Sequence, residues 1–265
     1  MILQILSLIG AIAIWISGSQ GAIAGVLSDR MLQYPNWHQV QFGQRRGELA
    51  YPEWFRGEWL VTSTLVEQLA PLAPEIITPG FEGNRRYLDR PISFPVRFID
   101  AKPSPKVSFL NLPQLGASLA KPPIVPDRAF NGMSISTAYL GEGVVKSVKV
   151  DPENPTRQIT QLTQDRQLVS FVTGFKQELP QPTNLIATEV AQQVFRGNSE
   201  IYLNIVETTT DYQFSPTPTP KITATQISAI YLSPKDPDYF RALDPGNRPV
   251  ALYKYHLDLV PNPDR

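Results

Sequence analysis

Cysteine is absent from the sequence, and histidine occurs only twice. Without cysteine the chain has no disulfides, thiolate metal ligands, cysteine nucleophile or lipid-modified N-terminal cysteine. His38 and His256 stand near opposite ends, and no H-E-x-x-H pair or acidic cluster has metal-ligand spacing. The G-x-S-x-G elbow, the P-loop and the dinucleotide fingerprint are also missing. The sequence therefore predicts no enzyme, metal or cofactor. A hydrolase whose carboxylates converge from distant strands stays an alternative.

An excess of either charge is also lacking. The 24 basic and 24 acidic side chains give a formal net charge of zero. No general field then attracts a phosphate backbone or an anionic membrane, so we expect no nucleic-acid partner. The 26 prolines and 16 glycines predict frequent turns and few long helices. We expect the protein to be a monomer by itself.

Charged side chains are missing from Met1 to Leu27, and residues 2–16 are nearly all apolar. The small-x-small run Ala22-Ile23-Ala24 follows, which is the pattern that signal peptidase needs. We therefore interpret residues 1–24 as a signal peptide that is cleaved after Ala24. The first residues carry no Lys or Arg, and an uncleaved membrane anchor is the competing interpretation.

After this segment, we expect an N-terminal arm at 25–50 and a single β domain at 51–265. Residues 71–126 are rich in proline and are interpreted as an irregular insertion with one short strand candidate, 95–99. The other strand candidates combine β-branched and aromatic residues between turn signals. They are 57–65, 134–140, 143–150, 157–164, 167–177, 185–195, 200–214, 221–232 and 249–260.

Short links between these candidates favour sequential antiparallel neighbours. The runs Gly141-Glu142-Gly143 and Arg196-Gly197-Asn198-Ser199 are typical hairpin turns, and Pro216-Thr217-Pro218-Thr219-Pro220 predicts a stiff, exposed connection. The last strand alternates, with Tyr253, Tyr255, Leu257 and Leu259 on one face and Lys254, His256 and Asp258 on the other. The pattern favours a mainly β fold, an antiparallel up-and-down barrel, with a sandwich as the alternative.

Two short motifs resemble the lipocalin and calycin barrels: Gly57-x-Trp59 at the first strand and Thr210-Asp211-Tyr212 downstream. In that family the tryptophan packs across the closed end of the barrel. The family's arginine after the final strand has no clear counterpart here. The resemblance implies a carrier of a small apolar ligand, such as a pigment or lipid, with an internal apolar cavity. The alternative for Trp59 is an ordinary core aromatic.

A broader resemblance rests on the run 51–59 (Tyr-Pro-Glu-Trp-Phe-Arg-Gly-Glu-Trp), the run 80–87 (Gly-Phe-Glu-Gly-Asn-Arg-Arg-Tyr) and Tyr253-Lys254-Tyr255-His256. These segments are similar to an uncharacterised family of cyanobacterial and plastid proteins. The plastid members lie in the thylakoid lumen, and one green-algal relative associates with photosystem II during assembly. The resemblance implies a thylakoid-lumen or periplasmic accessory protein, peripheral to the membrane, which binds a photosynthetic membrane complex during assembly or repair. It supplies no catalytic residues.

Aromatic area and guanidinium groups occur together in two of these runs, a mixture that is enriched where proteins recognise one another. The candidate partner- or ligand-binding residues are Trp54, Arg56, Trp59, Arg85, Arg86 and Tyr87. One alternative is that the tryptophans belong to the core and the arginines are solvated. Another is that an anionic lipid or a pigment-derived ligand is held at the mouth of the barrel.

Overall fold

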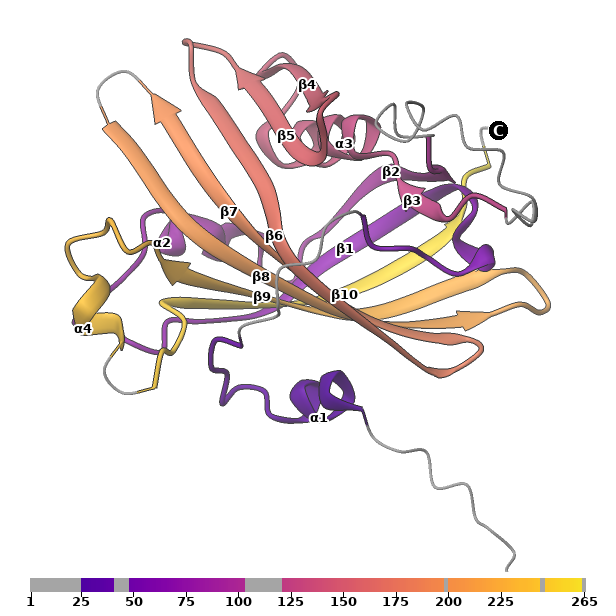
Figure 1. Cartoon of the computed structure of the whole chain (residues 1–265), viewed down its shortest axis with the longest axis horizontal. Helices are drawn as coiled ribbons and strands as arrows, with labels where there is room; N and C mark the ends of the chain where they lie inside the picture. Colours follow the sequence, from indigo (N-terminus) through magenta and orange to yellow (C-terminus); the bar gives the residue numbers. More distant parts are fainter. Residues whose placement is uncertain (1–24, 41–47, 103–120, 198–199, 244–245, 264–265) are drawn as a thin grey trace, which may run out of the picture.

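Paired strands form one large antiparallel sheet (Figure 1), and the side chains of each strand alternate between its two faces. The computed structural model describes residues 25–40, 48–102, 121–197, 200–243 and 246–263. Within them, ten strands run in the order β3-β2-β1-β10-β9-β8-β7-β6-β5-β4. Their bounds are β1 Gly57–Leu69, β2 Pro91–Asp100, β3 Ile124–Pro126, β4 Val145–Asp151, β5 Asn154–Leu162, β6 Gln167–Gln181, β7 Asn184–Gly197, β8 Glu200–Ser215, β9 Lys221–Leu232 and β10 Ala251–Pro261. Because β1 pairs with β10, the early and late parts of the chain meet within the sheet.

The predicted mainly β, antiparallel up-and-down fold is confirmed. Every strand candidate from 143 onward corresponds to one of the strands β4 to β10. The sheet is a strongly curled half-barrel. Within the described residues its two outer strands, β3 and β4, do not pair with each other, so the ring of backbone hydrogen bonds stays open. The segment predicted as a signal peptide, residues 1–24, lies outside the described residues.

The predicted strand at 134–140 is wrong, because these residues belong to the helix α3, Arg128–Leu140. The side chain of Asp127 caps the helix by accepting the Phe130 N–H at 3.2 Å. Gly141 follows the helix with φ 94°, and its N–H donates to the Thr137 carbonyl at 2.8 Å. The run Gly141-Glu142-Gly143 is therefore a helix-to-strand connection and not a hairpin. The alternating β-branched residues of 134–140 concealed a helix whose start signal lies seven residues earlier.

The segment predicted as an irregular insertion contains strand β2, which pairs with β1 from Gly57↔Phe98 to Thr64↔Pro91. Strand β3 covers only residues 98–100 of the outer edge of β2. The backbone N–H and C=O of Arg97 point to this outer edge, where Asn131 binds both. Pro91 and Pro95 lie six and two residues before Arg97, so their backbone nitrogens face the same outer edge of the strand. No neighbouring strand needs an N–H donor at these two positions. The prolines therefore mark an exposed edge of the strand.

Helix α3 packs against β2, β4 and β5, and so bridges the gap between the two ends of the curled sheet. The Asn131 side chain accepts the Arg97 N–H at 2.7 Å and donates to the Arg97 carbonyl at 3.1 Å. The side chain thus takes the place of a neighbouring strand's peptide group. This contact caps an edge that could otherwise pair with another chain.

The sheet buries apolar residues on both faces. On the concave face, the main core includes Trp59, Val61, Phe94, Leu185 and Leu257. On the opposite face, part of the predicted N-terminal arm covers a smaller core of Trp37, Ile227, Ala229, Tyr231 and Leu252. The predicted alternation of the last strand is confirmed near its end, where Leu257 and Leu259 are buried and His256 is exposed.

The remaining helices are short. They are α1 Val26–Leu32, α2 Phe81–Asn84, α4 Tyr239–Leu243 and the 3-10 helices η1 Glu53–Phe55 and η2 Arg85–Tyr87. Helix α1 lies on the side of the sheet opposite to α3 (Figure 1). None of the helices in the described ranges has the length and apolar character that a membrane crossing needs.

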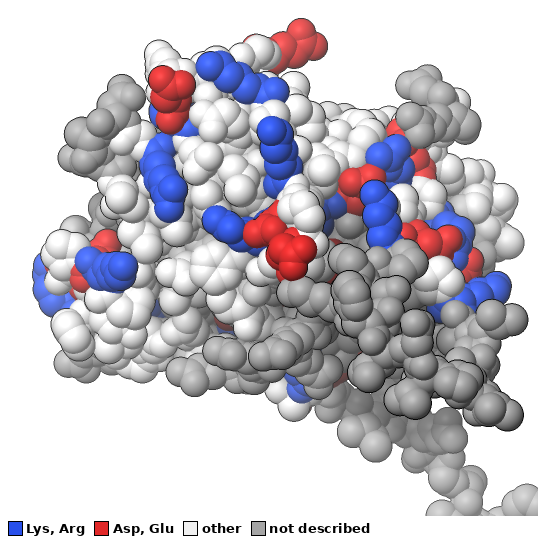
Figure 2. Space-filling view, turned by 45° about the horizontal axis from the view of Figure 1, so that its top comes forward, with Lys and Arg blue, Asp and Glu red and all other residues white. Residues whose placement is uncertain are grey.

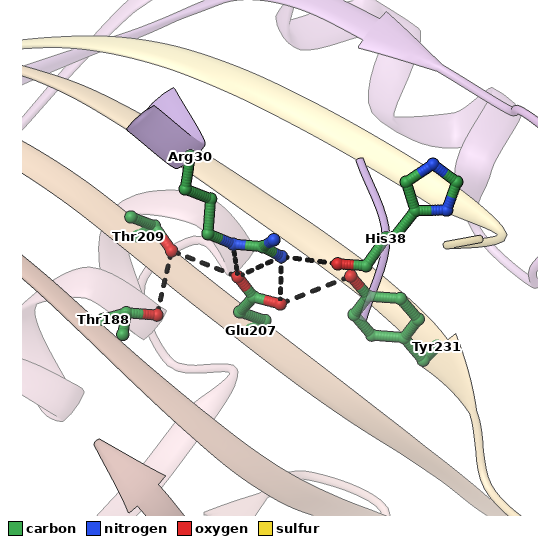
Figure 3. A network of polar contacts seen from close by, with 6 residues as sticks. All are labelled: Arg30, His38, Thr188, Glu207, Thr209 and Tyr231. Atoms are coloured by element: carbon green, nitrogen blue, oxygen red, sulfur yellow. Dashed lines mark hydrogen bonds and ion pairs between the residues drawn. The ribbon is translucent and has the colours of Figure 1, made fainter. Parts of the chain in front are cut away.

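A single buried ion pair fastens the N-terminal arm to the sheet (Figure 3). The Arg30 guanidinium donates through Nε and Nη2 to the two Glu207 carboxylate oxygens, each at 2.8 Å. Nη2 also donates to the His38 carbonyl at 2.7 Å, and the guanidinium lies 4.1 Å from the centre of the Trp37 ring. Residues 25–40 are therefore an ordered part of the fold.

Charge is mixed over the surface. Figure 2 shows Lys and Arg side chains interspersed with Asp and Glu over the visible face, without a continuous area of one sign. Surface ion pairs such as Arg157–Asp151 at 3.0 Å and Arg241–Asp238 at 2.6 Å contribute to this arrangement. Pairs of this kind contribute about 0–1 kcal/mol each.

Candidate functional site

A cavity of about 510 Å³ lies between the concave face of the sheet and helix α3. Its volume falls within the range of about 300–1,000 Å³ that is usual for small-molecule sites. The helix contributes Arg128, Asn131, Ile135 and Tyr139, whose spacing places them on one face. The sheet contributes residues from β1, β2, β3, β5, β7, β8, β9 and β10. The concave face of the half-barrel therefore carries a half-open cavity, and the helix is part of its wall.

One end of the cavity is closed by an aromatic cluster. Its members are Tyr51, Trp54, Phe55, Trp59, Phe98, Tyr212 and Phe214. The Phe55 ring lies 4.7 Å from the Phe98 ring and 5.1 Å from the Tyr212 ring. The buried Trp59 indole donates to the Phe55 carbonyl at 2.8 Å, which satisfies its only polar atom. The two lipocalin-like motifs thus meet at the same closed end, although Thr210-Asp211-Tyr212 lies within strand β8.

Polar side chains line the cavity farther from this cluster. Gln226 and Ser228 of β9 face it together with Thr208 and Thr210 of β8 and Tyr255 of β10. The Thr210 hydroxyl donates to Gln226 Oε1 at 3.4 Å, and Gln226 Nε2 donates to the Ser228 hydroxyl at 3.4 Å. Both distances exceed the usual range of about 2.5–3.2 Å. These groups therefore keep hydrogen-bonding capacity for a bound molecule.

The charged groups at the cavity wall neutralise one another. Arg128 donates to Glu189 at 2.6 Å and to Glu48 at 3.1 Å. Burial alone would lower the pKa of Arg128, but the nearby carboxylates, Glu189 first, outweigh it and raise the pKa. Burial also raises the pKa of Glu48, against the opposing effect of Arg128. The carboxylates therefore hold Arg128 charged, and burial makes Glu48 easier to protonate than an exposed glutamate.

The tyrosines at the cavity stay protonated. Burial is the first cause that raises the pKa of Tyr51, Tyr139, Tyr212 and Tyr255. Their hydroxyl groups are therefore neutral donors and acceptors at ordinary pH. The Tyr139 hydroxyl lies 3.2 Å from the Ser63 hydroxyl, which links helix α3 to strand β1. This contact holds the helix over the cavity.

A second cavity of about 500 Å³ lies between the start of α3 and the β4–β5 hairpin. It shares Pro126 and Arg128 with the first cavity. Its other lining residues include Glu48, Lys102, Asp127, Asp151 and Glu153. Arg128 and its carboxylate partners therefore stand between the two spaces.

The first three predicted site residues lie in η1 (Trp54), directly before β1 (Arg56) and near the start of β1 (Trp59). Trp59 is 5 % exposed and belongs to the core. Trp54 stacks on Phe214 with ring centres 5.0 Å apart and donates to the Pro182 carbonyl at 3.1 Å. Arg56 is exposed and pairs with Glu53 and Asp100, both at 2.7 Å. Trp59 is thus part of the core, and Trp54 is partly buried against Phe214.

The other three predicted residues form η2. Arg85 pairs with Glu82 at 3.1 Å, and the Arg86 guanidinium lies 4.7 Å from the centre of the Tyr87 ring. The next residues run beside Leu65, whose carbonyl accepts the Asp89 N–H at 2.9 Å. At a rise of about 3.3 Å per residue, Leu65 lies roughly 30 Å along β1 from Arg56. The structure therefore does not join the predicted residues into one surface.

The sequence analysis missed the polar cavity residues, although β9 carries a usable signal. Its inward positions read Ile222, Ala224, Gln226 and Ser228, so two polar residues follow two apolar ones on the same face. A polar residue at an inward position is more informative than an apolar one. Arg128 and Glu189 gave no such signal, because only the folded chain brings them together.

No group of three or more His, Cys, Asp or Glu side chains within the described ranges is placed to hold a metal ion. No curated protein and no solved structure matches the chain. One family does match: the domain of unknown function DUF6816 corresponds to residues 43–262, a span that includes the strands, α3 and the residues that line the cavity. The chain therefore belongs to the DUF6816 family.

Proposed function

We propose that the protein is a non-catalytic binding protein that holds a small molecule inside its half-barrel. The observation that carries this proposal is the cavity of about 510 Å³ on the concave face of the sheet. A core closed by side-chain packing would leave no such space. The proposal corresponds to the carrier interpretation of the lipocalin-like motifs.

The wall of the cavity suits a reversible ligand. Apolar residues such as Val61, Phe94 and Leu259 supply contact area, and a small number of polar groups can orient a bound molecule. Sheet strands and a helix that is fastened at Asn131 and Tyr139 hold these side chains in place. Such a site is preformed, which lowers the cost of ordering on binding.

Export to a thylakoid lumen or periplasm, and docking to a photosynthetic membrane complex, stay predictions. They rest on residues 1–24 and on the sequence resemblance. Two of the six candidate docking residues, Trp54 and Trp59, are engaged in packing. A ligand carrier is compatible with a thylakoid lumen and with a periplasm.

The binding proposal is tested by filling the cavity. Thr208 lines the cavity from β8, whereas Thr225 lies on the opposite face of the same sheet, between Asp211 and His256. Thr208→Phe should weaken binding of the uncharged dye Nile red by about tenfold or more, which corresponds to about 1.4 kcal/mol. Thr225→Phe adds the same side chain outside the cavity and should leave the affinity unchanged.

The readout is Nile red fluorescence in a titration of the purified chain, with circular dichroism to show that both variants fold. Organic extraction of the purified protein followed by mass spectrometry should also release a bound small molecule. Equal Nile red affinities in the two variants, or no binding to the parent chain, would contradict the proposal.

A further inference from the structure

The cavity has a polarity gradient that follows the register of its strands. Leu259 pairs with Ile222 and with Val61, and all three are apolar. The neighbouring row joins the apolar Leu257 and Ala224 to Ser63 of β1, whose hydroxyl meets the Tyr139 hydroxyl. The apolar row lies next to the aromatic cluster, because Trp59 is the next inward residue of β1. In the next row of inward residues, farther from the cluster, the side chains are polar.

The next row across the sheet is polar on three adjacent strands. Thr210 of β8 pairs with Gln226 of β9, and Gln226 pairs with Tyr255 of β10. The following row pairs Thr208 with Ser228. Successive inward residues lie about 7 Å apart along a strand. The cavity therefore presents an apolar end beside the aromatic cluster and a hydrogen-bonding band about one row away.

The one charged residue that pairs into this band is Glu189 of β7, which lies opposite Thr208 and is bound by Arg128. Amide and hydroxyl groups supply both donors and acceptors. Burial raises the pKa of Tyr255, which keeps its hydroxyl protonated. The long contacts of Gln226, at 3.4 Å on each side, can be exchanged for contacts to a ligand oxygen.

The charged residues of the wall disfavour a charged ligand. Arg128 is the one cation among the described lining residues, and Glu189 and Glu48 already bind it. An anionic ligand would meet two carboxylates around one guanidinium. A cationic ligand would have to compete with Arg128 for Glu189. Either ion would lose hydration without gaining a free counter-charge.

We infer that the cavity takes an uncharged amphipathic molecule, bound with its apolar end toward the aromatic cluster and a hydroxyl or carbonyl oxygen at Gln226 and Thr210. The inference rests on the proposed function and narrows it. A molecule with an apolar body and one neutral oxygen-bearing end satisfies both the gradient and the charge balance.

Four probes with the same alkyl chain test the class: decanol, decanamide, decanoic acid and decylamine at neutral pH. Each competes with Nile red in the full chain. Decanol and decanamide should bind at least about tenfold more tightly than the two charged probes. Gln226→Leu should weaken decanamide binding by about tenfold, because it removes the hydrogen-bonding amide. Gln213→Leu is the matched control, since Gln213 is exposed.

Orientation is read from tryptophan fluorescence. Decanol with a bromine on its last carbon should quench Trp54 and Trp59 more strongly than decanol with a bromine beside the hydroxyl-bearing carbon. Trp37 lies on the opposite face of the sheet and supplies a constant background. The measurement is made with Trp15→Phe in every protein, since Trp15 lies outside the described residues. Equal quenching by the two isomers, or stronger quenching by the second, would overturn the predicted orientation.

The outcomes separate this inference from the proposed function. A charged probe that binds as tightly as decanol overturns the ligand class, while the Thr208→Phe effect on Nile red can still stand. Failure of all four probes to compete also overturns the inference. If Nile red binding is in addition insensitive to Thr208→Phe, the proposed function falls as well.

Discussion

Arg30 and Glu207 form a two-pronged ion pair across 177 residues of sequence, with both hydrogen bonds at 2.8 Å. The pair is almost fully buried, at 4 % and 0 % side-chain exposure. Thr209 donates to the same carboxylate at 3.2 Å and Tyr231 donates at 3.3 Å (Figure 3). Burial raises the pKa of Glu207, and the Arg30 charge counteracts this effect. The arm is thus fixed by a buried ion pair in which each charged group is the counter-charge of the other.

Removing one partner of this pair should destabilise the fold strongly. Arg30→Met should lower the free energy of unfolding by about 3–5 kcal/mol, because it leaves a buried carboxylate without its counter-charge. The double variant Arg30→Met/Glu207→Leu should recover most of that loss. Urea unfolding measures both. Arg56→Met removes an exposed guanidinium and should cost about 0–1 kcal/mol. Additive losses in the double variant would contradict the role of the buried pair.

Glu48 should make stability depend on pH. Its pKa is raised above the ordinary value of 4.5, first by burial, so the folded state binds its proton more tightly than the unfolded state does. The stabilisation is complete below the unfolded pKa, and it is lost as the pH rises from 4.5 through the higher folded pKa. Glu48→Gln should therefore remove this fall in stability, which chemical unfolding at a series of pH values measures.

Glutamine keeps an oxygen that can accept the Arg128 hydrogen bond but has no proton to lose in this pH range. The variant therefore separates the effect of Glu48 ionisation from the effect of losing the hydrogen bond. Glu142 is exposed, and Glu142→Gln is the control at a glutamate outside the cluster. An unchanged pH profile of stability in Glu48→Gln would contradict the prediction. So would a parent protein whose stability rises with pH over this range while the stability of Glu48→Gln does not.

Asn131 should stabilise the fold through the edge of β2. Asn131→Ala leaves the Arg97 N–H without its acceptor, which should cost about 1–3 kcal/mol, whereas the Arg97 carbonyl keeps the hydrogen bond from the Asp127 N–H at 2.9 Å. The Arg97 amide should also exchange its hydrogen faster. Urea unfolding and hydrogen exchange are the measurements. Ser134→Ala changes a different position of the same helix and should be neutral or slightly stabilising. Equal effects of the two substitutions would show that Asn131 has no special role.

The strands of the second half were predictable because their pattern is local. In β10 the inward residues Leu257 and Leu259 are apolar and the outward His256 is polar, and this alternation alone specifies the strand and its buried face. Only the second half of strand β2 was predicted, at 95–99, because Pro91 resembles a loop residue until the outer edge of the strand is known to be free. Helix α3 was concealed because its deciding signal, the Asp127 cap, precedes the alternating run.

The cavity was less predictable than the fold, because it depends on contacts between distant residues. The hollow interior requires α3 to stand away from the sheet, with Tyr139 reaching Ser63 and Asn131 reaching Arg97. Likewise, Arg128 is neutralised by Glu48 and Glu189, which lie 80 and 61 residues away. The aromatic residues that suggested a docking surface were conspicuous in the sequence, but packing uses Trp54 and Trp59 at the closed end.

The Gln158 side chain should oppose any side chain at position 132 of α3, because it occupies the space that a Cβ would fill. A Cβ at position 132 would lie 2.5 Å from Gln158 Nε2 and 2.9 Å from its Cδ. A helix-interior Gly→Ala change ordinarily stabilises by about 1 kcal/mol, but here the Gln158 amide must first move. Gly132→Ala alone should therefore gain less than this amount, and Gly132→Ala in a Gln158→Ala background should gain all of it. Urea unfolding of the four proteins gives the coupling, and additive effects would mean that Gln158 adjusts without cost.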